Sequence, residues 1–392
     1  MTSGKQVVYF IGVGLPKSLE KPGKRIPLMY DFVQVMAEYS DSDDTILTTL
    51  AELENAEAFR YKCDDCAKLA RKVVGKEADR SSATRIAFKR AFMSRQPESI
   101  EQVLANALAK GPGAEGPSGT ALVIRFNYAI NRFFSLLGWE VDWVPLDGFL
   151  HHQFTQYPPS SNVHTFVSFN YDLILDRAIQ RAAEEIWNPF TGYGFHVRRY
   201  LECGKDRIAG LPAWLQCPPG ERIRILKPHG SLNWLVPQTR SGQTGDIGYT
   251  LGDGPVCVPL TQRGEIAYSD IIEPKAVFPT ILAVCIIPPT EPAKGVALGF
   301  IEKTRCLERL AIESADEVYV VGWSMPATDK DQDLLICSSV GERRKPLDSV
   351  TVINRGEHPD YFQRIADTFG LTRSALRIFN NGFSDYVQHC CA

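Results

Sequence analysis

The sequence predicts an α/β fold: a Rossmann-like parallel sheet with a large helical insertion after the first strand. Gln6–Ile11 is a β-branched and aromatic run that stops at Gly12, as a buried strand does before a tight loop. Five further short runs are apolar rather than alternating, which is typical of strands covered on both faces. They are His164–Phe169, Arg222–Leu226, Glu317–Gly322, Ser349–Asn354 and Ala375–Phe379.

The segments between these strands explain the topology and the insertion. Helical segments such as LILDRAIQRAAEEIW and GFIEKTRCLERLAIES alternate with the later strands, and this alternation indicates a parallel, doubly wound sheet. Between the first strand and the second, apolar residues recur at three- and four-residue spacing. We therefore expect one domain from residues 1–34 plus 151–392, and a helical insertion subdomain over residues 35–150. Residues 188–272, rich in Gly, Pro and Arg, fit neither pattern.

Composition excludes several classes of protein. The 392 residues are 44% hydrophobic and 23% charged, and the formal net charge of -3 provides no global attraction for nucleic acid or anionic lipid. No segment approaches the roughly 18 apolar residues that a membrane span requires, and the N-terminus lacks the pattern of a signal peptide. We expect a cytoplasmic protein with no membrane partner.

The ten cysteines do not indicate a disulfide framework, which belongs to short secreted chains. Cys63 and Cys66 have the spacing of metal ligands, but no second close pair follows them, and structural zinc needs four ligands. Two free thiols on a helix is the simpler interpretation. We expect no metal site.

Polar or glycine-containing loops follow most of the predicted strands. Gly12 and Gly14 follow the first strand, where glycines let backbone amides approach a phosphate, although a tight turn would look the same. Asn170 and Asp172 follow the second; they could serve a ligand or only cap the next helix. His229 stands between Pro228 and Gly230 on a loop, where it could act as a general base or have no role.

Two later strands end in the same way, at Gly322 with Ser324 and at Asn354. The carboxyl ends of parallel strands meet at one edge of a sheet, so these loops should lie together. This repetition is more informative than any one motif, and it is typical of a dinucleotide site.

In this order, the motifs resemble the sirtuin-like NAD-binding superfamily, and within it the bacterial branch associated with antiphage defence. The resemblance spans nearly the whole chain and is carried by GVGLPKSLE, IPLMYDF, SIEQVLA, FVSFNYDLILDRA, KPHGSLNW, IIPPTEPAK, VYVVGWSMPATDKD and VTVINRG. It implies a sirtuin-like fold and an NAD⁺ hydrolase that releases nicotinamide and ADP-ribose, with NAD as a consumed substrate.

The resemblance also implies a role for each site residue. Asn170 would hold the nicotinamide-side ribose or the attacking water, and His229 would be the base. The cofactor-binding residues would be Gly12, Gly14, Asp172, Gly322, Ser324 and Asn354.

Two departures from the family pattern keep alternatives open. Pro16 stands where the family usually has Ser in its glycine loop, and it removes a donor. The paired CxxC module of the deacylases is missing. The alternatives are a non-catalytic sensor of NAD or ADP-ribose that regulates a partner, and ADP-ribosyl transfer or deacylation. Because an NAD-destroying activity would harm its own cell, we expect it to be restrained by homo-oligomerisation or by a separate partner. In the resembling family such partners include ATPases and Argonaute-like proteins.

Overall fold

The structure is a computed structural model of the chain. It describes residues 4–23, 25–28, 30–40, 44–74, 81–109, 119–137, 141–195, 197–199, 221–240, 247–249, 256–257, 281–286, 299–326 and 329–391. Every structural statement below refers to these residues.

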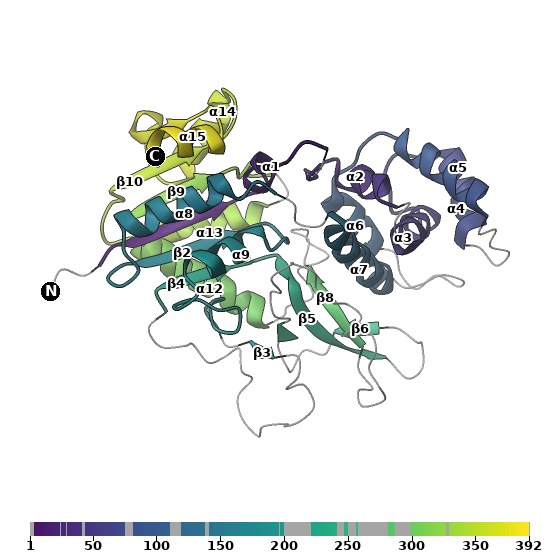
Figure 1. The fold of residues 1–392 in the computed structure, drawn as a ribbon, viewed down its shortest axis with the longest axis horizontal. Helices are drawn as coiled ribbons and strands as arrows, with labels where there is room; N and C mark the ends of the chain where they lie inside the picture. The colour runs from purple at the N-terminus through teal and green to yellow at the C-terminus, as the bar shows by residue number, and fades with distance from the viewer. Residues whose placement is uncertain are drawn as a thin grey trace, which may run out of the picture.

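The centre of the molecule is a six-stranded sheet in which every neighbouring pair is parallel. Its order is β11 (Leu376–Phe379), β10 (Ser349–Ile353), β9 (Glu317–Val321), β1 (Gln6–Ile11), β2 (Val163–Ser168) and β4 (Ile223–Leu226) (Figure 1). Counted along the chain within this sheet, the order reads 3-2-1-4-5-6, that of the dinucleotide-binding Rossmann fold. The predicted fold class is confirmed, with strand boundaries within one residue of those expected.

The strands are apolar because both faces of the sheet are covered. In β1, Val7, Tyr9 and Ile11 belong to one core cluster, whereas Val8 and Phe10 belong to another. Successive side chains of a strand point to opposite faces, so one run of sequence supplies both cores. The first face is covered by α8 (Val144–Gln156), α9 (Ile174–Ala182) and α15 (Phe383–Cys390). The second is covered by α12 (Gly299–Ser314), α13 (Lys330–Gly341) and α14 (Pro359–Thr368).

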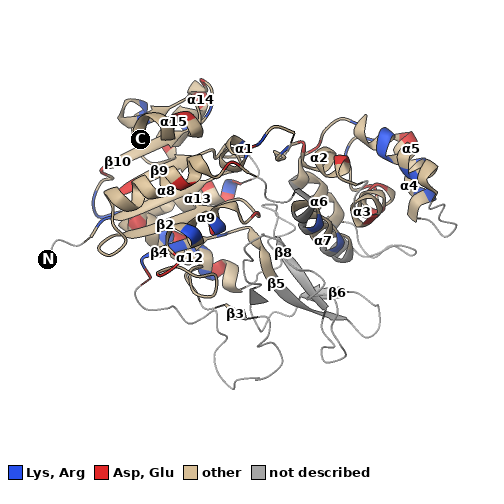
Figure 2. Cartoon of the chain, in the orientation of Figure 1, with Lys and Arg blue, Asp and Glu red and all other residues tan. Residues whose placement is uncertain are grey.

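A block of helices follows β1, as expected. After the short α1 (Gly14–Ser18) it contains α2 (Phe32–Glu38), α3 (Asp44–Asn55), α4 (Asp64–Val74), α5 (Ser82–Met93), α6 (Ile100–Ala109) and α7 (Gly119–Leu137). It lies beside the sheet in Figure 1, and its apolar faces join the first core cluster. Acidic residues begin α4 and basic residues end it, which suits the helix dipole (Figure 2). No described helix is both long and apolar enough to span a membrane.

A second, smaller sheet was not predicted. The long strand β5 (Gly230–Arg240) pairs antiparallel with β8 (Ile281–Ile286), β6 (Ile247–Tyr249) and β7 (Val256–Cys257). β3 (Arg198–Arg199) pairs with β7, and a short 3-10 turn, Arg373–Ala375, precedes β11. Because β5 starts at Gly230, the loop that carries His229 joins the two sheets directly.

The interpretation of Cys63 and Cys66 as two free thiols was wrong. Their Cα atoms are 5.1 Å apart at the start of α4, and their sulfurs are paired as a disulfide. The turn into the helix folds the chain back, and the amide of Cys66 points at the Cys63 sulfur at 3.3 Å.

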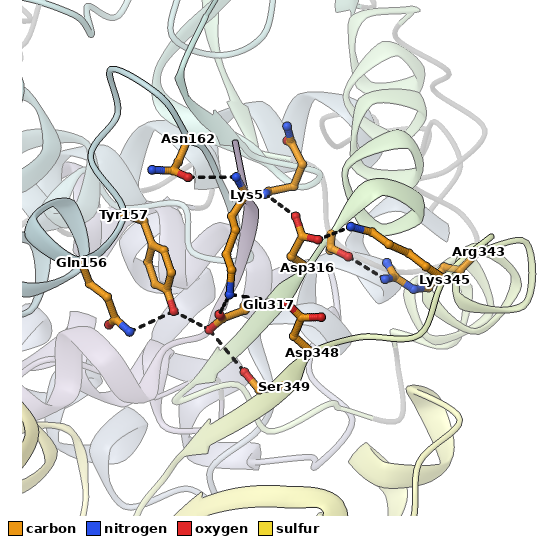
Figure 3. A network of polar contacts seen from close by, with 12 residues as sticks. Lys5, Gln156, Tyr157, Asn162, Asp316, Glu317, Arg343, Lys345, Asp348 and Ser349 are labelled. Atoms are coloured by element: carbon orange, nitrogen blue, oxygen red, sulfur yellow. Dashed lines mark hydrogen bonds and ion pairs between the residues drawn. The ribbon is translucent and has the colours of Figure 1, made fainter. Parts of the chain in front are cut away.

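A polar network joins the amino ends of the central strands (Figure 3). Glu317, at the start of β9, accepts hydrogen bonds from Lys5 Nζ (2.5 Å), Tyr157 Oη (2.6 Å) and Ser349 Oγ (3.3 Å). Burial opposes ionisation of Glu317, but the bonds from Lys5 and Tyr157 outweigh it and lower its pKa. The network therefore fixes this end of the sheet around one carboxylate.

We predict that Glu317→Gln lowers the free energy of unfolding by about 1.5 to 3 kcal/mol at neutral pH, because charge-assisted bonds are lost from a buried acceptor. A lowered carboxyl pKa stabilises the fold above the ordinary value near 4.5, and this contribution disappears as pH falls through the folded-state pKa. The difference between variant and wild type should thus shrink in acid, as measured by urea unfolding over a pH series. Asp348→Asn, at the exposed partner of Lys5, is the control and should change little. A deficit that is independent of pH would contradict this account.

Candidate functional site

The loops after β1 and β9 meet at the carboxyl edge of the sheet, at the centre of the strand order. The amides of Gly12 and Gly14 donate to the carbonyls of Val321 and Gly322, both at 2.9 Å. A Cβ on Gly12 would lie 2.4 Å from Trp323 Cα, and one on Gly322, whose φ is +59°, would lie 2.5 Å from Leu15 N. Only glycine allows this approach of backbone to backbone. The glycines therefore let the β1 and β9 loops pack backbone against backbone, and the amides of Gly12 and Gly14 are engaged between the loops.

Pro16 lies in the first turn of α1 and is buried. Amides of a first turn have no partner within the helix, so proline costs no helical hydrogen bond there. Pro16 does, however, leave the first turn of α1 with one backbone N–H fewer to donate to an anion.

Asn170 is placed against the β1 loop. It follows β2, is 8% exposed, and its Nδ2 donates to the carbonyl of Gly12 at 3.1 Å. With Nδ2 engaged, Oδ1 is the atom of this amide that can accept a hydrogen bond from a ligand hydroxyl or water. Asn170 and Gly12, far apart in sequence, thus form one corner of the edge.

Asp172 shapes the same loop. Its carboxylate accepts the amide of Ile174 at 2.9 Å, at the start of α9. Burial raises the pKa of Asp172 to about 6, although the nearby Lys227 lowers it. The helix-capping interpretation therefore accounts for its contacts, and its position orders the loop of Asn170.

Lys227 joins the loops after β2 and β4. Its fully buried Nζ donates to the Asp172 carbonyl (2.6 Å) and to Asp176 Oδ2 (3.1 Å). Asp176 also accepts from Tyr193 Oη at 2.6 Å, and Asn233 in β5 donates to that hydroxyl at 3.0 Å. Sequence analysis missed this network; the lysine ending an apolar strand, two residues before His229, was the available signal.

His229 lies on the loop that Lys227 fixes, and it is 6% exposed. Its ring centroid is 6.0 Å from that of Phe169, the residue before Asn170. Phe169 stacks on Trp323 at 4.5 Å, and Trp323 stacks on Phe10 at 5.7 Å. The His229 ring thus stands at one end of a row of aromatic rings that continues through Phe169 and Trp323 to Phe10. It also borders a cavity of about 440 Å³ beside α12 and α13.

The remaining predicted residues lie at the same edge with fewer contacts. Ser324 follows β9 and is exposed. Asn354 follows β10, and its Oδ1 accepts the amide of Arg355 at 2.9 Å. The β9 loop is held from α14, since Tyr361 donates to the Trp323 carbonyl at 2.6 Å and Arg364 to the Met325 carbonyl at 2.7 Å. Among the described residues, no group of three or more His, Cys, Asp or Glu side chains could hold a metal ion.

We predict that Gly12→Ala destabilises the protein by about 1 to 3 kcal/mol or more, because the new methyl group would meet backbone rather than a movable side chain. Gly341→Ala is the matched control. A Cβ there has nothing within 4 Å, and the position ends α13, so stability should be unchanged or slightly higher. Thermal or urea unfolding measures both, and equal stability of the two variants would show that the glycine loops are not closely packed.

We also predict that Lys227→Met lowers the unfolding free energy by about 3 to 5 kcal/mol, since it leaves Asp176 buried and unpaired. The double variant Lys227→Met with Asp176→Asn should recover part of that loss. The control is Arg181→Met, whose ion pair with Asp147 is exposed, with an expected cost below about 1 kcal/mol. A double variant no more stable than Lys227→Met would contradict the role given to the buried pair.

Comparison with known proteins gives one weak structural similarity. No family model and no curated protein matches the sequence. Among solved structures, the chain is similar to one described as "The Structural basis for Sirtuin Substrate affinity", with 9% identity and a TM-score of 0.32 over 97% of this chain and 90% of that one. A similarity this low supports no argument about the site.

Proposed function

We propose that this chain binds NAD at the carboxyl edge of its parallel sheet and cleaves the bond between nicotinamide and ribose. The observation that carries the proposal is the corner at β1, where Asn170 is bonded to Gly12 beside the glycine contact of the β1 and β9 loops. In open parallel sheets ligands bind at this edge, where the strand order reverses. The pyrophosphate would lie against these two loops.

Asn170 and His229 would carry the chemistry. Departure of nicotinamide builds positive charge at the ribose carbon, and an enzyme accelerates the step by stabilising that charge and the ribose hydroxyls. Oδ1 of Asn170 would accept a hydrogen bond from a ribose hydroxyl or a water. His229, on the neighbouring loop, would take the proton of the attacking water. NAD would be consumed, giving nicotinamide and ADP-ribose.

The rival proposal is a sensor that binds NAD or ADP-ribose without cleaving it and regulates a partner. Pro16 favours it, because the first turn of α1 offers one amide fewer to a phosphate. ADP-ribosyl transfer and deacylation are further alternatives. Nicotinamide release without an acyl-lysine peptide distinguishes hydrolysis from deacylation.

The proposed biological role follows from the cost of the reaction. A protein that destroys NAD would harm its own cell unless it were restrained. We therefore propose an antiphage-defence effector held inactive by oligomerisation or by a separate partner, such as an ATPase or Argonaute-like protein. Size-exclusion chromatography with light scattering tests this restraint, and a monomer that is active without any trigger would contradict it.

We predict that wild type releases nicotinamide from NAD once lysate of phage-infected cells lifts its restraint, and that Asn170→Ala and His229→Ala each reduce this rate at least about 100-fold. Each protein is assayed with and without lysate of phage-infected cells, and folding is checked by thermal melting. His389→Ala is the control, since that ring is exposed and contacts only its own helix in the described structure. Wild type that binds NAD but releases nothing under either condition would favour the sensor.

A further inference from the structure

Asp329 stands at a position where an aspartate side chain usually caps a helix. It is the N-cap residue of α13, and aspartate there usually accepts an amide of the first turn. Here the carboxylate makes no capping hydrogen bond, although the backbone carbonyl of Asp329 accepts the amides of Gln332 (3.0 Å) and Asp333 (3.1 Å). The helix therefore starts through the backbone carbonyl alone, and the Asp329 carboxylate has no capping role.

That carboxylate faces His229. Asp329 Oδ1 lies 3.4 Å from His229 Nε2, and the two residues are 5% and 6% exposed. Nε2 is buried and makes no hydrogen bond within the described part of the chain. The pair is within ion-pair distance, and a small rotation of either side chain would complete a hydrogen bond.

Other charged residues of α12 and α13 surround the pair. Burial, together with the charge of Asp329, raises the pKa of Glu308 in α12 to about 8, and Gln332 of α13 donates to Glu308. Arg305 and Arg309 of α12 and Asp331 of α13 line the same cavity as His229 and Asp329.

We propose that Asp329 is a positioning residue for the proposed NAD cleavage, and that it holds His229 with the ring proton on Nε2 so that Nδ1 accepts the proton of water. A carboxylate at one ring nitrogen fixes which tautomer is present. In the balanced reaction the water oxygen bonds to the ribose carbon, the carbon–nitrogen bond breaks, and nicotinamide leaves with the electron pair. The proton from water passes to Nδ1, and the Asp329 carboxylate stabilises the imidazolium that forms.

This inference depends on the proposed function. One of its two measurements, the tautomer of His229, can be made whether or not the proposed function is correct. The variants are Asp329→Asn, which keeps the size and a good N-cap residue, and Asp331→Asn, which removes a second carboxylate from the lining of the same cavity. Nicotinamide release gives kcat and KM. The ¹⁵N shifts of His229 at mildly alkaline pH, assigned by comparison with His229→Gln, give the tautomer directly.

We expect Asp329→Asn to lower kcat by about 100-fold or more with KM within about threefold, because geometry and tautomer, not binding, are lost. The Nε2–H tautomer should dominate in wild type and in Asp331→Asn, and lose that dominance in Asp329→Asn. Wild-type kcat and an unchanged tautomer in Asp329→Asn would overturn the inference. If wild type releases no nicotinamide, the proposed function fails, and the ¹⁵N spectra still decide whether Asp329 sets the tautomer of His229.

Discussion

The arrangement of the candidate site depends on one buried ion pair, that of Lys227 with Asp176. Both side chains are fully buried, and their contacts link the β2 loop, α9, the end of β4 and the first residues of β5. A buried charge is tolerated only where its partners are complete, so each of these segments is restricted to one arrangement. The loops that carry Asn170 and His229 are both attached to this network. Their geometry therefore follows from the hydrogen bonds that the buried ammonium group of Lys227 requires.

The two ends of the sheet use different physical means. At the amino end, Glu317 collects three donors, and the strands are held by charged and hydroxyl side chains (Figure 3). At the carboxyl end, the β1 and β9 loops are held by backbone hydrogen bonds, from Gly12 to Val321 and from Gly14 to Gly322, and they pack too closely for side chains on these glycines. One end of the sheet is thus held by polar side chains and the other by backbone.

The sequence predicted the central sheet well because each strand carries its own signal: an apolar run of the right length, bounded by turn residues. It did not predict the β5–β8 sheet, since β5 begins directly at the histidine motif and contains Pro237, which argues against a strand. Asn170 and His229 could be proposed because each follows a predicted strand and because each stands in a motif that carries the family resemblance. Asp329 could not, because an aspartate before a helix is explained by capping, and only the three-dimensional structure places its carboxylate on His229. The engagement of the Gly12 and Gly14 amides likewise depends on contacts with the distant β9 loop that local sequence does not encode.

The central claim is that ligand binds at the carboxyl edge of the sheet, and hydrogen exchange with and without NAD tests it most directly. The account predicts slower exchange in NAD at residues 12–19, 168–173, 226–231 and 322–326, whether or not the bond is cleaved, and no change around Lys5 and Glu317 at the opposite end. Protection confined to the helices between residues 44 and 109, or no protection at saturating NAD, would contradict it.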